Sequence, residues 1–115
     1  GSSLAKSADN ESREGKLISN VIPEAFALLQ NYPNPFNPNT VISFALPEAG
    51  VVQLTIYNLH GQEVRTLIYG QMNAGLHSLN WDGKDNNSQI LPSGVYLYKL
   101  RVNGFAQTRK MTFMK

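Results

Sequence analysis

The stretch VYLYKLRVNGFAQTRKMTFM, residues 95–114, indicates the fold class of this chain. Asn103-Gly104 is the dipeptide favoured by a two-residue type I′ turn, in which both central residues have positive φ. The antiparallel register then pairs Val102 with Phe105, Leu100 with Gln107, Tyr98 with Arg109 and Tyr96 with Met111. This face of the hairpin is aromatic and apolar, so we expect it to lie in the core. Arg109 is expected over the ring of Tyr98, near the edge of the sheet.

Five further segments have the composition of short strands. They are EAFALLQ at 24–30, TVISFAL at 40–46, VVQLTIY at 51–57, QEVRTLI at 62–68 and LHSLNW at 76–81. Apolar and polar residues alternate in most of them, and turn sequences such as PEAG and NLHG separate them. No helical period extends beyond one turn. The pattern predicts an all-β fold, an antiparallel β-sandwich of about seven strands.

The length and composition of the chain fit one modest domain. It has 115 residues, of which 42% are hydrophobic and 16% are charged, and it contains no cysteine. No apolar run approaches the roughly 20 residues that a membrane helix needs. Residues 1–22 are polar and without periodicity, so we expect a tag remnant and flexible linker there. One β-sandwich domain is expected at residues 23–115.

The net charge of +2 is distributed unevenly along the chain. After residue 98 come five basic residues and no acidic one: Lys99, Arg101, Arg109, Lys110 and Lys115. Lys99, Arg101 and Lys110 share the face of the predicted hairpin opposite its aromatic face. This basic face is either simply solvated or a docking surface for an anionic or protein partner. Nucleic acid is not expected, because its binding usually needs more positive charge with exposed aromatic residues between.

No arrangement of side chains predicts catalysis or a bound cofactor. The two histidines, His60 and His77, form no metal-binding pair, and no serine lies in a nucleophile elbow. DGKDNN, from Asp82 to Asn87, is the most metal-like stretch, because its side-chain oxygens suit calcium. Its spacing is not that of an EF-hand, and the same residue types are common in turns, so we favour a turn. We therefore expect a protein that is not an enzyme and needs no cofactor or metal.

The sequence NYPNPFNPNT, residues 31–40, packs three prolines and four asparagines into ten positions. Proline lacks the backbone N–H and restricts the residue before it, so this proline segment predicts a stiff, extended corner outside any central strand. Presenting so rigid a segment to a partner costs little ordering entropy. We expect Tyr32 and Phe36 to anchor the corner to the core.

Four blocks of sequence resemble, in order, the C-terminal sorting domain (type A) of the type IX secretion system of Bacteroidetes and related bacteria. They are NYPNPFNPNTVISFAL, LTIYNLHGQEVRTL, AGLHSLNWDGKD with LPSGVYLYKL, and RKMTFMK. The pattern is also similar to the immunoglobulin-like domain of flagellar hook-capping proteins. Both resemblances imply an immunoglobulin-like sandwich. One departure is DNNSQILPSG, which has Asn-Ser where sorting domains often carry a glycine.

The resemblance to sorting domains implies a non-catalytic secretion signal that follows a cargo domain in an exported multidomain protein. The implied partners are an outer-membrane translocon, its shuttle protein and a sortase, and the implied destination is the cell surface or the medium, reached through the periplasm and outer membrane. Cleavage is implied in the linker, between residues 15 and 22. The residues implied in partner recognition are Tyr32, Pro33, Asn34, Pro35, Phe36, Asn37 and Pro38, the pair Gly94 and Tyr96, and Lys110 and Lys115, to which the basic face adds Lys99 and Arg101.

A structural or accessory role stays open beside the sorting role. An immunoglobulin-like module can serve as a spacer or weak carbohydrate binder of a secreted enzyme, with Trp81, Tyr96 and Tyr98 as rings that could stack on sugars. A sandwich of this size also needs those rings for its core. The edge strands leave weak homodimerisation open as well.

Overall fold

The computed structural model of this protein describes residues 22–115. The tag remnant and linker that we predict for residues 1–22 fall, apart from Ile22, outside the described part, and both proposed domain limits stay predictions. Within residues 22–115 the regular structure consists of seven strands. No helix there has the length and apolar character needed to cross a membrane.

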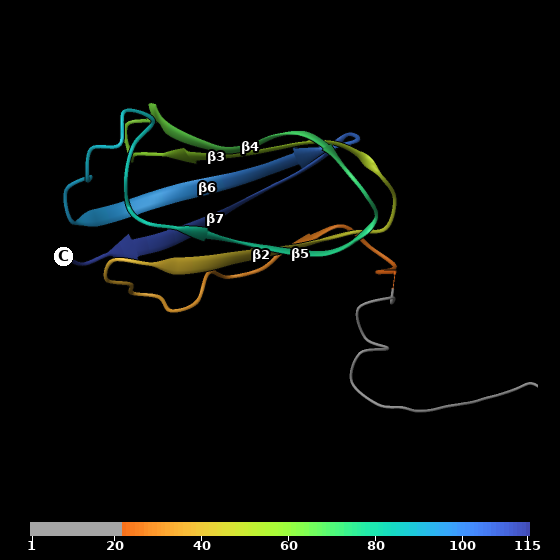
Figure 1. The fold of residues 1–115 in the computed structure, drawn as a ribbon, viewed down its shortest axis with the longest axis horizontal. Coiled ribbons are helices and arrows are strands. Elements are labelled where there is room, and N and C mark those ends of the chain that lie inside the picture. Colours follow the sequence, from red (N-terminus) through yellow and green to blue (C-terminus); the bar gives the residue numbers. More distant parts are fainter. Residues whose placement is uncertain (1–21) are drawn as a thin grey trace, which may run out of the picture.

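The seven strands form two antiparallel sheets that lie face to face (Figure 1). They are β1 (Ala27–Leu28), β2 (Thr40–Leu46), β3 (Gly50–Tyr57), β4 (Glu63–Met72), β5 (Gly75–Trp81), β6 (Gly94–Val102) and β7 (Phe105–Phe113). The smaller sheet has the strand order β1-β2-β5, and the larger sheet has the order β4-β3-β6-β7. The predicted all-β antiparallel sandwich of about seven strands is therefore confirmed.

The core lies between the two sheets and is built from the alternating apolar residues of the strands. On β2 the inward side chains are those of Ile42, Phe44 and Leu46, and each has 0% exposure. Burying one such side chain contributes about 1.5–3 kcal/mol, so these positions hold the sheets together. The three aromatic residues considered for sugar stacking are core residues: Trp81 and Tyr98 have 0% exposure and Tyr96 has 5%.

The hairpin of β6 and β7 has the predicted register, from Val102 opposite Phe105 down to Tyr96 opposite Met111. Asn103 and Gly104 have φ of 49° and 83°, as a type I′ turn requires. β7 is an edge strand of the larger sheet. Arg109 reaches across to the other sheet, because its Nε donates to the carbonyl oxygen of Leu28 in β1. The register alone did not predict this contact between the sheets.

The first predicted strand, residues 24–30, is reduced to the two residues of β1. The segment lies at the open side of the sandwich, where its backbone amides find partners in different sheets. Leu28 N donates to Oε1 of Gln107 in β7, whereas Leu29 N donates to the carbonyl oxygen of Ser43 in β2. Because successive amides bond to opposite sheets, no long ladder forms.

Candidate partner-recognition site

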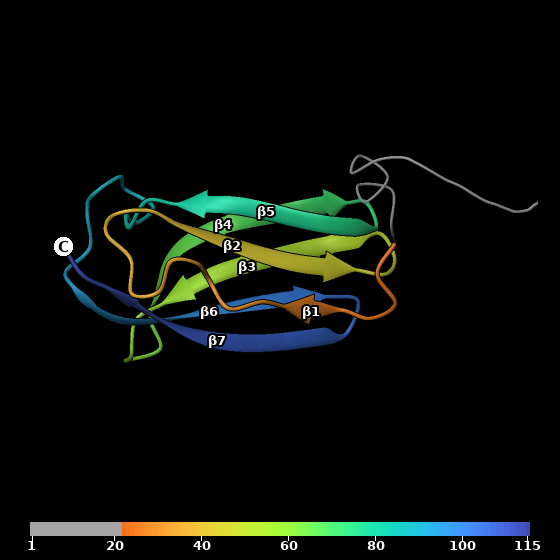
Figure 2. The same ribbon diagram turned by 90° about the horizontal axis from the view of Figure 1, so that it is seen from below.

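The proline segment closes one side of the sandwich by bridging the two sheets. Figure 2 shows the chain from β1 to β2 running along this side, between β2 and β7. Tyr32 pairs with Val41 of the smaller sheet through two backbone hydrogen bonds of 3.0 and 2.9 Å. Four residues later, Phe36 N donates to the carbonyl oxygen of Thr112 at 3.0 Å, and Met114 N donates to the carbonyl oxygen of Phe36 at 2.9 Å. The segment thus continues the larger sheet beyond β7.

The sequence predicted a stiff, extended corner at the proline segment, but the structure shows a segment with several bends. Bends occur at residues 33–35 and 37–38, and the peptide bonds before Pro33, Pro35 and Pro38 are cis. The side chain of Asn34 adds a third contact with the larger sheet, because its Oδ1 accepts a hydrogen bond from Thr112 N at 2.9 Å. Two sequence blocks that lie far apart, the proline segment and residues 110–115, therefore form one continuous surface.

A buried polar network fixes the start of the proline segment. Asn31, only 2% exposed, donates its backbone N–H to the Tyr98 hydroxyl at 2.8 Å, and that hydroxyl donates to the carbonyl oxygen of Leu29 at 2.7 Å. The Asn31 Nδ2 donates to Thr40 Oγ1 at 3.0 Å, and Thr40 Oγ1 donates to the carbonyl oxygen of Pro33 at 2.8 Å. Buried polar groups that are paired in this way specify one conformation of the backbone.

Burial raises the pKa of the Tyr98 hydroxyl above its usual value of 10.0, although the hydrogen bond from Asn31 and the charge of Arg109 both act in the opposite direction. The hydroxyl therefore stays protonated at neutral pH. It can donate one hydrogen bond and accept another at the same time, which is what the network requires of it.

Of the two expected anchors, only Phe36 enters the core. It is 1% exposed, its ring stacks on Phe113 with centroids 4.9 Å apart, and Trp81 lies at 5.6 Å. Tyr32 is 80% exposed, so the prediction that it anchors the segment to the core is wrong. The backbone pairing with Val41 holds Tyr32 in place and leaves its ring free. The exposed side chains of the predicted proline motif are those of Tyr32, Pro33, Asn34, Pro35, Asn37 and Pro38.

The predicted glycine-x-tyrosine pair lies at the start of β6, and its tyrosine supports the fold. The Tyr96 hydroxyl donates to the carbonyl oxygen of Pro92, four residues upstream, at 2.6 Å. A tyrosine at the start of this strand with a hydroxyl bonded back to the upstream backbone is a feature of immunoglobulin-like sandwiches. Gly94 begins the strand and is half-buried. Because Tyr96 is 5% exposed, it offers little surface to a partner.

The predicted basic residues divide between two places. Lys115 follows Met114, which is bonded to Phe36 of the proline segment, and its own backbone N–H donates to Ser93 Oγ at 2.9 Å. Lys99, Arg101 and Lys110 lie on the outer face of the larger sheet. Arg101 is opposite Ala106, which is about 20 Å along β7 from the residues bonded to the proline segment. The structure therefore gives two surfaces where the sequence suggested one set of residues.

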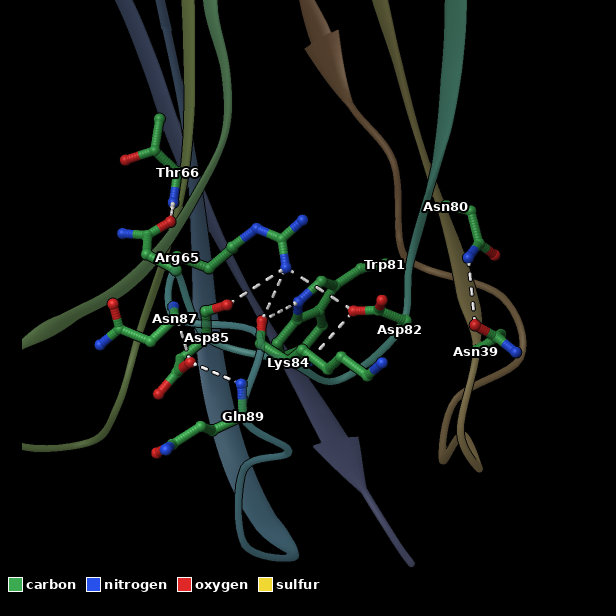
Figure 3. A network of polar contacts seen from close by, with 11 residues as sticks. Asn39, Arg65, Thr66, Asn80, Trp81, Asp82, Lys84, Asp85, Asn87 and Gln89 are labelled. Carbon is green, nitrogen blue, oxygen red and sulfur yellow. Dashed lines mark hydrogen bonds and ion pairs between the residues drawn. The ribbon is translucent and has the colours of Figure 1, made fainter.

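The loop at residues 82–89 is held by an arginine that sequence reasoning missed (Figure 3). Arg65 Nη1 donates to the carbonyl oxygen of Lys84 at 3.0 Å and lies 3.7 Å from Asp82 Oδ1. Asp85 Oδ1 accepts backbone N–H groups two and four residues later, which is turn chemistry. Among residues 22–115 no group of three or more histidine, aspartate and glutamate side chains could hold a metal ion. No sequence spacing pointed to Arg65, because its hydrogen bonds go to the backbone carbonyl oxygens of Lys84 and Asp85.

The two histidines lie in ordinary structural positions. His60 is exposed, and its backbone N–H donates to Oδ1 of Asn58 in the turn between β3 and β4. His77 faces inward, with its ring stacked on Phe44 at 5.4 Å between centroids. Its Nε2 donates to the carbonyl oxygen of Asn73 at 2.8 Å. His77 thus contributes to the packing beside Phe44, and His60 belongs to an exposed turn.

Two antiparallel sheets packed face to face, with a tyrosine corner at the start of the sixth strand, define an immunoglobulin-like β-sandwich. The sequence profile of the FlgD Ig-like domain matches residues 36–104, and the chain belongs to this family. The basal-body rod modification protein FlgD of Salmonella typhimurium is 42% identical over 48 residues, which cover 42% of this chain and 21% of that protein. The chain thus spans about a fifth of that relative.

Solved structures with a similar fold include PorU and PorZ of Porphyromonas gingivalis and FlgD proteins. Dimeric latent PorU from Porphyromonas gingivalis aligns with a TM-score of 0.64 and 19% identity, over 83% of this chain and 10% of PorU. PorZ, a surface component of the type IX secretion system of the same bacterium, aligns with a TM-score of 0.52 and 14% identity, over 84% and 12% of the chains. FlgD from Pseudomonas aeruginosa has a TM-score of 0.52 and 30% identity, over 64% and 58%. At such low identity, PorU and PorZ share the fold alone.

Proposed function

We propose that this chain is a non-catalytic sorting domain that directs an exported multidomain protein through the type IX secretion system to the cell surface or medium. The observation that carries the proposal is the joining of the proline segment to residues 110–115 through Phe36 and Asn34. The two most specific motifs of the resemblance thereby become neighbours on one exposed surface. The recognition of that surface would fall to the translocon, its shuttle protein and a sortase.

Tyr32 is the side chain on which we expect recognition to depend most. It is a large ring with 80% exposure, on a backbone that is already fixed by Val41 and by the network around Asn31. Tyrosine is enriched among the residues that dominate binding energy at interfaces. Because the backbone is fixed before binding, only the side chain of Tyr32 loses conformational entropy when a partner covers it.

The test is secretion of a reporter. Residues 22–115 are fused after a periplasmic reporter in a bacterium with an active type IX system, and the reporter is measured in the medium and on the cell surface. With Tyr32→Ala and Lys115→Ala combined, we expect the secreted share to fall about tenfold, as for a loss of about 1.4 kcal/mol of binding. Both side chains are exposed, so the variant should still fold, which its thermal unfolding checks.

A matched variant separates recognition from general damage to the surface. Leu59 is 64% exposed in the turn between β3 and β4, and Lys84 is exposed in the 82–89 loop. Leu59→Ala with Lys84→Ala removes an apolar and a basic side chain away from the proline segment, and secretion should not change. If the unchanged fusion is secreted and the variant at Tyr32 and Lys115 is secreted equally well, recognition does not depend on these two side chains. If the unchanged fusion stays in the periplasm, the sorting proposal is wrong.

A second candidate is a structural module of a larger assembly, which the FlgD Ig-like family match favours. In that case the domain would serve as a spacer or an accessory part of a secreted protein. Sugar stacking on Trp81 and Tyr98 is not part of this candidate, because both rings are fully buried. If the unchanged fusion and both double variants all stay in the periplasm, the result favours the structural module.

A further inference from the structure

The outer face of the larger sheet carries two rows of side chains that cross all four strands. The first row, read from the register, is Tyr69, Gln53, Arg101 and Ala106. The second row is Thr66, Thr55, Lys99 and Thr108. Neither row contains an acidic residue. At the β4 end of the second row, Glu63 Oε2 accepts a hydrogen bond from Thr66 Oγ1. The two central strands, β3 and β6, thus present two cations among neutral side chains in these rows, and we call this surface the basic face, with Lys110 of β7 at its margin.

Lys99 and Arg101 stand two residues apart in β6, so both point outward, with Cα atoms about 6.6 Å apart. Neither has a carboxylate within 4 Å among the described residues, where the ion pair found is that of Arg65 with Asp82. Two unpaired like charges on one strand repel each other. A ligand with two negative charges at the same spacing would relieve that repulsion.

A groove of about 340 Å³ continues the line of these two cations toward the β6–β7 turn. Its walls include Arg101, Val51 and Tyr69, and the turn residues Asn103 and Gly104 lie at its end. Tyr69 is 74% exposed and Val51 is 53% exposed, so this apolar surface is open to a partner. An apolar site thus directly follows the two positive charges along one direction of the sheet.

The hydroxyl of Thr55, beneath the basic face, lacks a hydrogen-bond partner in the described part of the chain. Thr55 lies opposite Lys99 and is 1% exposed, and its Oγ1 has no hydrogen-bond partner among residues 22–115. A buried hydroxyl without a partner is unfavourable, and most native hydroxyls in such places are paired. Because Oγ1 is buried, an oxygen of a ligand could accept this hydrogen bond only if the Lys99 side chain moved aside to bind that ligand.

We propose that the basic face binds an extended acidic polypeptide segment of a partner protein, with two carboxylates separated by one residue and an apolar side chain two residues further on. In an extended chain, alternate side chains lie on one side and are spaced by about 6.6 Å, which matches Lys99 and Arg101. The first two side chains meet the cations, and the third enters the groove beside Tyr69. This proposal is independent of the sorting function.

The apolar walls of the groove favour a polypeptide over an acidic glycan. Val51 and Tyr69 suit an aliphatic side chain, whereas a sugar unit would leave several hydroxyl groups facing them without partners. The regular spacing of the two cations along a strand also matches a polypeptide repeat directly. An acidic oligosaccharide is therefore the alternative that the experiment must distinguish.

Binding is measured by fluorescence anisotropy at low ionic strength, where exposed charges are least screened. The probe is a labelled, end-blocked peptide with the order Glu-x-Glu-x-Leu, and the comparison peptide has the same composition with its two glutamates adjacent. Adjacent side chains of an extended chain point in opposite directions, so we expect the comparison peptide to bind about tenfold more weakly than the first peptide. Added salt should weaken binding of the first peptide.

The chain offers matched variants for the same assay. Lys99→Gln and Arg101→Gln should each weaken binding of the first peptide by about tenfold, whereas Lys84→Gln, on an exposed loop, should leave it unchanged. Glutamine keeps much of the side-chain length, so the fold should persist, and thermal unfolding checks this. Equal affinity for both peptides, or unchanged binding by the two variants on the face, overturns the proposal. Stronger binding of an oligogalacturonate through the same two residues also overturns it, because the ligand would then be a glycan.

Discussion

The Tyr98 hydroxyl is the atom that joins the core of the larger sheet to the start of the proline segment. It accepts the backbone N–H of Asn31 and donates to the carbonyl oxygen of Leu29. Tyr98→Phe removes both hydrogen bonds and leaves two backbone groups without that partner, so we expect a loss of about 1–3 kcal/mol of stability. Urea unfolding measures it. Tyr69→Phe, at a 74% exposed position, is the control and should change stability little.

The same hydroxyl makes stability depend on pH in the alkaline range. Burial raises the pKa of Tyr98 in the folded state above its usual 10.0, so the unfolded chain releases this proton first as pH rises. The contribution to stability is complete below pH 10.0 and is lost as pH rises through the folded pKa. Burial raises the pKa of Tyr96 in the same direction. Tyr98→Phe should therefore show a shallower loss of stability above pH 10.0, and an equal slope would contradict this account.

Among the elements, β7 depends on the proline segment for its last residues. Asn34 Oδ1 accepts a hydrogen bond from the backbone N–H of Thr112. This N–H lies on the free edge of β7, the edge that is not paired with β6. Asn34→Ala should loosen this end by about 0.5–1.5 kcal/mol and speed hydrogen exchange at the Thr112 amide. Exchange is followed by NMR, with Asn37→Ala, another exposed asparagine of the segment, as the control. Equal exchange in both variants would mean that the Asn34 contact does not hold β7.

Local sequence signals predicted the elements well and their contacts across the sandwich poorly. Asn103-Gly104 gave the register of β6 and β7 because a two-residue turn leaves one way to pair the strands. Phe36 and Tyr32 look alike in the sequence, yet one is buried and the other exposed, since the bends of the segment decide which ring faces inward. Arg65 and Arg109 donate hydrogen bonds to backbone carbonyls of distant segments, which carry no signature in side-chain order.

At the scale of the whole molecule, the two sheets present different chemistry to a partner. The strands β1, β2 and β5 contain no lysine, arginine, aspartate or glutamate, whereas β6 and β7 together carry four basic residues. The proline segment lies between these two faces and is bonded to both sheets. A partner that recognises the proline segment therefore meets a neutral surface on one side and a basic one on the other, which fixes its orientation.

Residues 110–115 contribute side chains to the core, and this determines how a deletion of these residues must be interpreted. Met111 and Phe113 both have 0% exposure, and losing them costs about 5–10 kcal/mol, comparable to the whole stability of a small domain. A chain that ends at Arg109 should therefore lose cooperative unfolding, as followed by circular dichroism. A chain that ends at Phe113 keeps both side chains and loses the backbone contacts of Met114 and Lys115, so it should stay folded and lose only about 1–2 kcal/mol. Cooperative unfolding of the chain that ends at Arg109 would show that the second half of β7 is dispensable for the fold, and lost secretion on that deletion would then report recognition instead of folding.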